Sequence, residues 1–150
     1  MVTKKSIDDF LAPKKMAIAG VSRNPKKFGY QVYKELSEKG YQVFPINPNT
    51  DTIDGKLCYK SVSALPEDVK HLLVLTPKTQ TESVVQEAKL KGITNLWIQQ
   101  TSQTDKAIEI ATEAGMNLIY KRCIYTFAEP VKGVHKFHRS IMKLFGQLPR

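Results

Sequence analysis

The stretch Met16-Ala-Ile-Ala-Gly20 is a short apolar run that ends in glycine. Such a run is typical of a strand that is buried on both faces of a parallel sheet. A polar loop, residues 21–27, follows it. Apolar residues then recur at helical spacing through Phe28–Lys39, and Gly40 can end that helix. The order strand, loop, helix predicts the first half of a β-α-β unit.

The same alternation continues along the chain. Further short apolar runs predict strands at 41–46, 71–75, 96–98 and 117–120, with helices at 79–91 and 105–114. Residues 61–65 predict one weak, short element, and Pro45 is unusual for a central strand. Alternating strands and helices indicate an α/β fold, a doubly wound, Rossmann-like parallel sheet of five strands. A chain of 150 residues fits a single domain, with its core at about residues 15–130.

The last part of the chain, residues 131–150, has a different pattern. Apolar residues recur there at helical spacing with lysine and arginine between them, which predicts a basic amphipathic helix. Such a helix can bind a membrane surface or nucleic acid. We favour the alternative that its apolar side packs on the sheet. His135 and His138 share one face of it, but no third metal ligand is evident, so we expect no metal site.

The formal net charge of +9 is concentrated at the two ends of the chain. Residues 1–30 carry seven basic and two acidic side chains, and residues 121–150 carry seven basic side chains and one acidic side chain. Residues 31–120 carry nine basic and eleven acidic side chains. This pattern suits a nucleic-acid binder or a pocket for a small polyanion, and it also suits simple solubility. No apolar run approaches the ~20 residues of a membrane span. The two cysteines form no disulfide framework, so we expect a cytoplasmic protein.

Ligands of an open α/β sheet bind beyond the carboxyl ends of its strands. The residues that follow the predicted strands are polar, small or basic, as expected for a site that binds a nucleotide through hydrogen bonds. The candidate binding residues are Gly20, Ser22, Arg23, Asn24, Gly29, Asn47, Pro48, Thr76, Pro77, Gln99, Arg122 and Cys123.

The loop after the first strand has the strongest physical argument for binding phosphate. Gly20 permits a sharp turn, and Gly29 permits a close approach of the helix. The start of the following helix offers free N–H groups and a positive dipole to a pyrophosphate. The spacing is neither G-x-G-x-x-G nor a P-loop. Asn47 follows the second strand where NAD-binding proteins carry an acid, which disfavours NAD.

Several segments together resemble the small stand-alone CoA-binding domain proteins, which are similar to the nucleotide domain of the succinyl-CoA synthetase α subunit. The matching stretches are Ala19-Gly-Val-Ser-Arg-Asn-Pro25, Gly29, Val43-Phe-Pro-Ile-Asn-Pro-Asn49, Gly55-Lys-Leu-Cys-Tyr-Lys-Ser-Val-Ser-Ala-Leu-Pro66, Leu96-Trp-Ile-Gln-Gln100 and Lys121-Arg-Cys123. The resemblance covers about residues 15–130.

The resemblance implies coenzyme A as the ligand. Its diphosphate would bind at the first loop, its nucleoside near Asn47 and Pro48, and Thr76 and Pro77 would form the neighbouring wall. Lys26-Lys27 and the basic tail depart from the family pattern. The family has no agreed reaction, so it implies a ligand but no chemistry.

The sequence therefore predicts a module that binds CoA or an acyl-CoA and senses or carries it, without catalysis of its own. The enzyme alternative is an NAD(P)- or CoA-dependent catalyst that uses Cys123, whose neighbour Arg122 could activate the thiol. We favour a packing role for Cys123. A third alternative is a nucleic-acid-associated protein that uses the two basic ends. The sequence identifies no protein partner.

Overall fold

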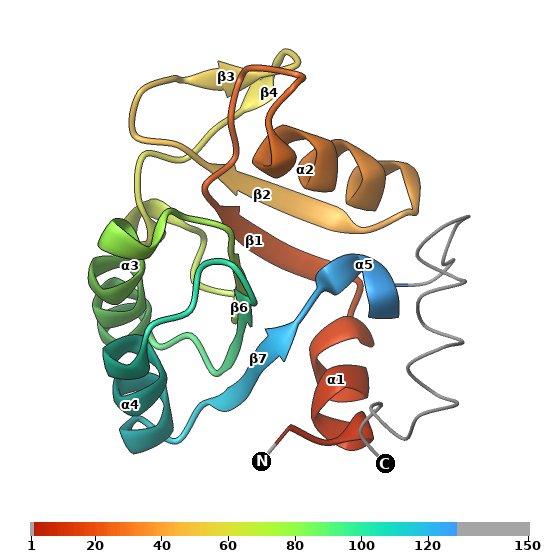
Figure 1. Ribbon diagram of the computed structural model, residues 1–150. Coiled ribbons are helices and arrows are strands. Elements are labelled where there is room, and N and C mark those ends of the chain that lie inside the picture. The colour runs from red at the N-terminus through yellow and green to blue at the C-terminus, as the bar shows by residue number, and fades with distance from the viewer. Residues whose placement is uncertain (1, 129–150) are drawn as a thin grey trace.

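A computed structural model describes residues 2–128 of the chain, and its centre is a parallel sheet (Figure 1). The five strands lie in the order β2 (Gln42–Ile46), β1 (Lys15–Ala19), β5 (His71–Val74), β6 (Asn95–Gln99) and β7 (Asn117–Arg122). All four strand pairs are parallel. The predicted five-stranded parallel sheet is confirmed.

Helices cover both faces of this sheet. On one face lie α1 (Lys4–Leu11), α2 (Phe28–Glu38) and the single turn α5 (Ile124–Phe127) (Figure 1). On the other lie α3 (Lys78–Lys91), α4 (Asp105–Glu113) and the 3₁₀ turn η1 (Val62–Ala64). The doubly wound arrangement is thus also confirmed. No helix within residues 2–128 combines the length and apolar content that crossing a membrane requires.

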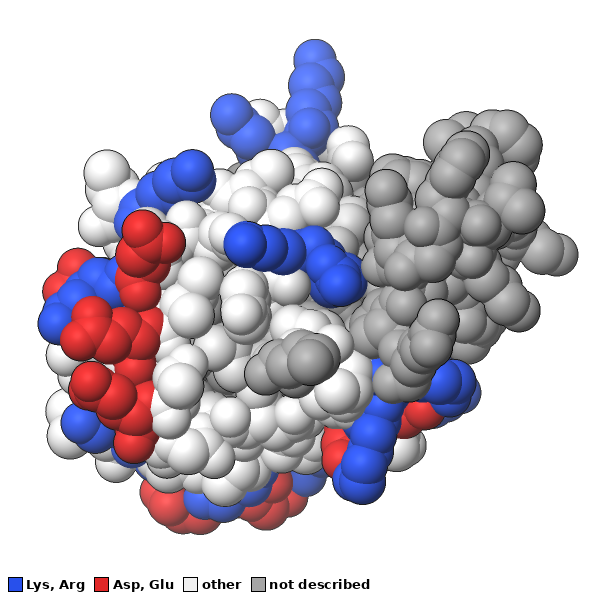
Figure 2. Space-filling view, turned by 60° about the horizontal axis from the view of Figure 1, so that its bottom comes forward, with Lys and Arg blue, Asp and Glu red and all other residues white. Residues whose placement is uncertain are grey.

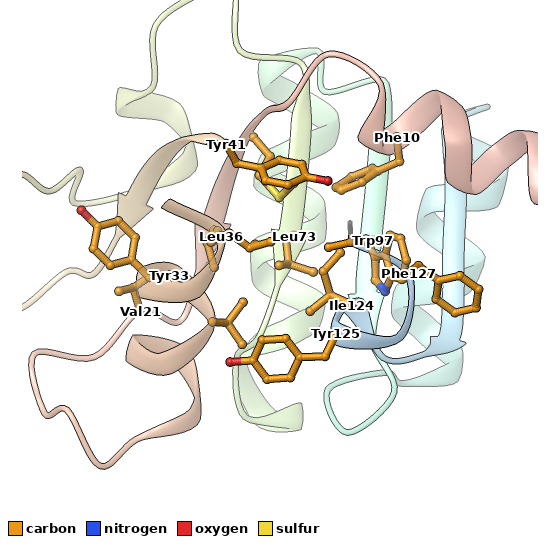
Figure 3. Close-up of a cluster of buried hydrophobic side chains, with 14 of the residues drawn as sticks. Phe10, Val21, Tyr33, Leu36, Tyr41, Leu73, Trp97, Ile124, Tyr125 and Phe127 are labelled. Carbon is orange, nitrogen blue, oxygen red and sulfur yellow. The ribbon is translucent and has the colours of Figure 1, made fainter. Parts of the chain in front are cut away.

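The apolar strands are buried because each one faces helices on both sides. Along β1, Met16 and Ile18 join one core cluster, whereas Ala17 and Ala19 join the other. The first cluster contains most of the aromatic side chains, with Trp97 fully buried at its centre (Figure 3). Small alanines on the second face let α3 and α4 pack closely against the sheet.

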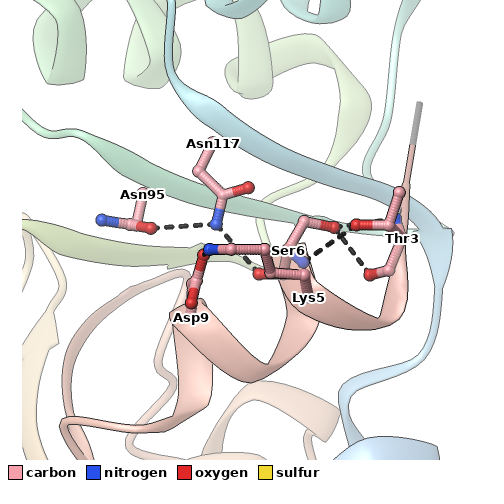
Figure 4. A network of polar contacts seen from close by, with 6 residues as sticks. All are labelled: Thr3, Lys5, Ser6, Asp9, Asn95 and Asn117. Carbon is pink, nitrogen blue, oxygen red and sulfur yellow. Dashed lines mark hydrogen bonds and ion pairs between the residues drawn. The ribbon is translucent and has the colours of Figure 1, made fainter. Parts of the chain in front are cut away.

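The sequence analysis did not predict helix α1. A reciprocal capping box starts it: the Ser6 N–H donates to Thr3 Oγ1 over 3.0 Å, and the Thr3 N–H donates to Ser6 Oγ over 2.9 Å (Figure 4). Asn117 Nδ2 donates to the Ser6 carbonyl and to Asn95 Oδ1, both over 2.9 Å. These bonds fasten α1 to the amino ends of β6 and β7.

A small hairpin of β3 (Thr52–Ile53) and β4 (Lys56–Leu57) was also not predicted. Its turn residues Asp54 and Gly55 both have positive φ, 51° and 75°, as a tight two-residue hairpin turn requires. The Tyr30 hydroxyl donates to Asp54 Oδ2 over 2.8 Å and holds the hairpin beside α2.

Pro45 fits its strand because β2 is at the edge of the five-stranded sheet. An edge strand tolerates a residue without an N–H group. The predicted basic helix at 131–150, including His135 and His138, lies outside the described residues.

Apolar pattern and burial differ at one position of α3. The pattern that predicts this helix includes Leu90, yet Leu90 is 85% exposed. Phe10 of the unpredicted helix α1 is fully buried instead, and its ring centroid lies 5.5 Å from that of Trp97.

We expect Phe10→Ala to lower the free energy of unfolding by about 3–5 kcal/mol, because it leaves a cavity beneath α1. Leu90→Ala should change it by less than about 0.5 kcal/mol, since that side chain is in solvent. Urea unfolding monitored by Trp97 fluorescence measures both. Similar losses for the two variants would contradict the placement of α1.

Candidate functional site

A cleft of about 510 Å³ lies at the carboxyl edge of the sheet, around the ends of β1, β2 and β5. β1 lies between β2 and β5, so the strand order reverses at this point. Such a reversal is where open α/β sheets bind ligands, because the two loops separate to opposite faces. The lining residues are Ala19, Gly20, Val21, Ser22, Ile46, Asn47, Pro48, Asn49, Lys60, Ser61, Val62, Thr76, Thr79, Gln80, Ser83, Val84 and Glu87.

Two glycines bring three elements together at the base of this cleft. Gly20 has φ +94°, and a Cβ there would lie 2.8 Å from the Leu75 carbonyl carbon. A Cβ on Gly29 would lie 2.1 Å from the Gly20 carbonyl oxygen. Gly29 therefore lets α2 pack against the end of β1. The close approach that the sequence predicts at this position is an approach of helix to strand.

The loop between β1 and α2 is held by its own polar side chains. Ser22 Oγ accepts a hydrogen bond from the Asn24 N–H, and Asn24 Oδ1 accepts one from the Lys26 N–H, each over 3.0 Å. No side chain caps α2 at Lys27, and the first turn holds no acidic residue. An uncapped helix start of this kind can bind an anion through its N–H groups and positive dipole. Arg23 is exposed on the same loop.

Asn47 joins the loops that follow β1 and β2. Its Nδ2 donates to the Val21 carbonyl, and its Oδ1 accepts from the Asn49 N–H, both over 2.8 Å. Because one amide bonds both loops, Asn47 fixes the width of the cleft on this side. An aspartate in its place would lack the donor that Val21 requires.

The third wall is the first half of α3. Thr76 and Thr81 are buried, and their hydroxyl oxygens lie 2.8 Å apart. Pro77 is the N-cap residue of α3 and is not among the lining residues. The side chains that α3 itself turns into the cleft, among them Thr79, Gln80, Ser83 and Glu87, were not predicted as site residues. The signal for them was a polar series at helical spacing that continues from the predicted site residue Thr76.

The lining residues include two charged side chains, Lys60 and Glu87. Lys60 Nζ lies 2.8 Å from Asp51 Oδ1, and its hydrogen bond holds the pKa of the Asp51 carboxyl below its usual range. Glu87 Oε2 accepts a hydrogen bond from the Ser63 N–H over 3.1 Å, so this carboxylate holds η1 in place. Neither residue was among the candidate binding residues predicted from the sequence.

Gln99 and Arg122 are the last residues of β6 and β7, and Cys123 follows β7. None of the three is among the residues that line the cleft. Gln99 is buried; its Oε1 accepts from the Ile124 N–H over 3.1 Å, and its Nε2 donates to Cys123 Sγ over 3.2 Å. Arg122 Nη1 donates to the Lys121 carbonyl, while its Nε is buried and has no partner among the described residues. A ligand contact by these three residues stays a prediction.

The other cysteine, Cys58, lies beneath the β2 side of the cleft. Its Sγ is 3.8 Å from the Asn47 carbonyl oxygen, and burial raises the pKa of its thiol. A buried thiol with a raised pKa is a poor nucleophile. Within residues 2–128, no group of three or more histidine, cysteine or acidic side chains could hold a metal ion.

Of the twelve predicted site residues, Gly20, Ser22, Asn47, Pro48 and Thr76 line the cleft. Arg23, Asn24 and Gly29 belong to the loop and helix directly beside it. The structure thus brings the loops after β1, β2 and β5 to one cleft.

Comparison with known proteins agrees with this geometry. The chain matches the CoA binding domain family over residues 14–128. It is 32% identical over 129 residues to the alpha subunit of ADP-forming acetate–CoA ligase II from Pyrococcus furiosus, which covers 79% of this chain and 28% of that subunit. An uncharacterized protein of Bacillus subtilis is 30% identical, over 74% of this chain and 82% of its own.

Solved structures show the same fold. A hypothetical protein from Pyrococcus horikoshii matches with a TM-score of 0.80 and 31% identity, over 88% of this chain and 94% of its own. The dinucleotide-forming acetyl-coenzyme A synthetase 1 of Ca. Korarchaeum cryptofilum matches with a TM-score of 0.63 and 25% identity. The match covers 74% of this chain and 26% of that chain. The chain spans 28%, 12% and 14% of the length of three matched acetate–CoA ligases. The resemblance predicted from the sequence is confirmed, and the chain belongs to the CoA binding domain family.

Proposed function

We propose that this chain binds coenzyme A or an acyl-CoA in the cleft at the ends of β1, β2 and β5. The observation that carries the proposal is a cleft of about 510 Å³ at the reversal of strand order, in a member of this family. Small-molecule sites commonly measure about 300–1,000 Å³. The expected order along the ligand is the diphosphate at the β1–α2 loop and the nucleoside near Asn47 and Pro48.

The chemistry of the β1–α2 loop supports the position of the diphosphate. The uncapped start of α2 has no acidic residue in its first turn, so its positive dipole is not neutralised there. Arg23, Lys26 and Lys27 add formal charge on an exposed loop. Charge-assisted hydrogen bonds from arginine suit phosphate oxygens in particular. Ser22 and Asn24 already hold the loop, which lowers the conformational entropy lost on binding.

The cleft supports binding and release better than it supports catalysis. Hydroxyl and amide side chains provide most of its polar groups. Its carboxylate, Glu87, already accepts a hydrogen bond from the Ser63 N–H. Neither a thiol nor an imidazole belongs to the described lining. The chain would therefore sense or carry the coenzyme, or present it to a partner.

A second candidate function uses Cys123 as a reactive thiol. The observations that favour it are that Cys123 is only partly buried and that Gln99 Nε2 donates to its Sγ over 3.2 Å. The same amide also holds the start of α5 through the Ile124 N–H. The two contacts suit a packing role equally well, and we favour that role.

Nucleic-acid binding is less well supported. In the view of Figure 2, lysine and arginine side chains are scattered, and acidic side chains gather at the left and lower margins. Non-specific binding to nucleic acid favours a continuous basic surface. The described residues of this face offer none in that view.

CoA should bind this protein at least about tenfold more tightly than NAD, the effect of one missing charge-assisted hydrogen bond. The reason is that Asn47 stands where NAD binders carry an acid that accepts hydrogen bonds from the ribose hydroxyls. Isothermal titration calorimetry with each ligand measures the ratio. Equal or tighter binding of NAD would refute the assignment.

Arg23→Ala and Arg122→Ala should each weaken CoA binding by about 1–3 kcal/mol, the range for hydrogen bonds to charged groups. Lys106→Ala is the control, because Lys106 carries the same charge, lies on α4 and pairs with Glu109 of the same helix. Titration of the three variants against CoA compares them. If both arginine variants bind like the control, these arginines contribute only to solubility.

Cys123→Ser should leave CoA affinity within about 0.5 kcal/mol of the wild type, as expected for a packing residue. CoA should then not protect Cys123 from iodoacetamide, and mass spectrometry of the labelled peptide measures that protection. Strong protection, together with a mixed disulfide formed with oxidised CoA, would instead favour the reactive-thiol alternative.

A further inference from the structure

The cleft has one basic side chain among its described lining residues, Lys60. CoA carries two kinds of anion: a diphosphate, and a phosphomonoester on the ribose. The β1–α2 loop and the start of α2 offer N–H groups and positive charge to the diphosphate. The second anion needs a partner elsewhere in the cleft.

The backbone before Lys60 is fixed against the end of β2. Tyr59 forms a parallel bridge with Ile46. The Tyr59 N–H donates to the Pro45 carbonyl over 2.8 Å, and the Asn47 N–H donates to the Tyr59 carbonyl over 2.9 Å. Lys60 therefore starts from a rigid point beside Asn47, on the side of the cleft where we expect the nucleoside.

Lys60 and the diphosphate loop lie on different sides of the sheet edge. Residues 60–62 lead into η1, and Val62 packs in the core cluster beneath α3. Helix α2 packs in the other cluster. A ligand that crosses the reversal point would thus meet the start of α2 with one anion and Lys60 with another.

The present partner of Lys60 is easily replaced. Asp51 is 86% exposed and Lys60 54% exposed at their side chains, and ion pairs in solvent contribute little to stability. Asp51 itself is not among the residues that line the cleft. The Asp51 carbonyl accepts the Cys58 N–H over 2.9 Å, so its backbone can stay in place while Lys60 turns to another anion.

We propose that Lys60 selects the ligand by binding the phosphomonoester on its ribose, and that Asp51 holds the lysine until this phosphate replaces it. This inference rests on the proposed function. The site would then prefer CoA over dephospho-CoA, which lacks only that phosphate.

The test compares Lys60→Ala and Asp51→Asn with the wild type, using CoA and dephospho-CoA as probes. Lys60→Ala should weaken CoA about tenfold, the loss of one charge-assisted contact, and dephospho-CoA less than twofold. Asp51→Asn should strengthen CoA about two- to threefold, because Lys60 no longer has a competing partner. The wild type should bind CoA about tenfold more tightly than dephospho-CoA.

Lys106→Ala is the matched control, since Lys106 pairs with Glu109 at 56% and 54% side-chain exposure. It should change neither affinity more than twofold, and thermal unfolding should show all variants folded. Equal losses for both probes in Lys60→Ala, or losses no larger than the control, would overturn the role of Lys60 while CoA binding stands. Failure of the wild type to bind either probe would overturn the proposed function and this inference together.

Discussion

The contact between the Gly29 backbone and the Gly20 carbonyl oxygen is the constraint on which the rest of the site depends. A Cβ at position 29 would lie 2.1 Å from that oxygen, so only glycine lets α2 start where it does. Gly20 in turn lies against the Leu75 carbonyl at the end of β5. The backbones of β1, α2 and the residue after β5 therefore lie in direct contact at this point. The cleft forms there because the loops after β1 and β5 must separate above this point.

Hydrogen bonds then build the β2 side of the cleft on this base. Asn47 bonds the loop after β1 through Val21 and its own loop through Asn49. Tyr59, 13 residues further along the chain, forms a parallel bridge with Ile46 at the end of β2. The contact of Tyr59 depends on an edge position for β2, where the strand has room for Pro45 and for this additional neighbour. The wall that carries Lys60 thus consists of main-chain hydrogen bonds and one amide.

The division between a rigid base and a polar, partly exposed rim suits a module that binds and releases its ligand. Rigid loops limit the entropy lost on binding, while exposed pairs such as Lys60–Asp51 can exchange partners at little cost. The matched ligase alpha subunit is much longer, and this chain spans 28% of it.

The sequence alone predicts the five-stranded sheet, helices α2, α3 and α4, and the loops after β1, β2 and β5 that line the cleft, since short apolar runs followed by residues such as Gly20 or Asn47 are local signals. It also identified the family. Tertiary structure alone decided that β2 is an edge strand, that α1 is part of the core and that Lys60 reaches the cleft. Each depends on contacts between segments far apart in the chain, such as Ile46 with Tyr59 or Asn117 with Ser6. Local spacing carries no information about such contacts, because folding and not proximity in sequence brings these residues together.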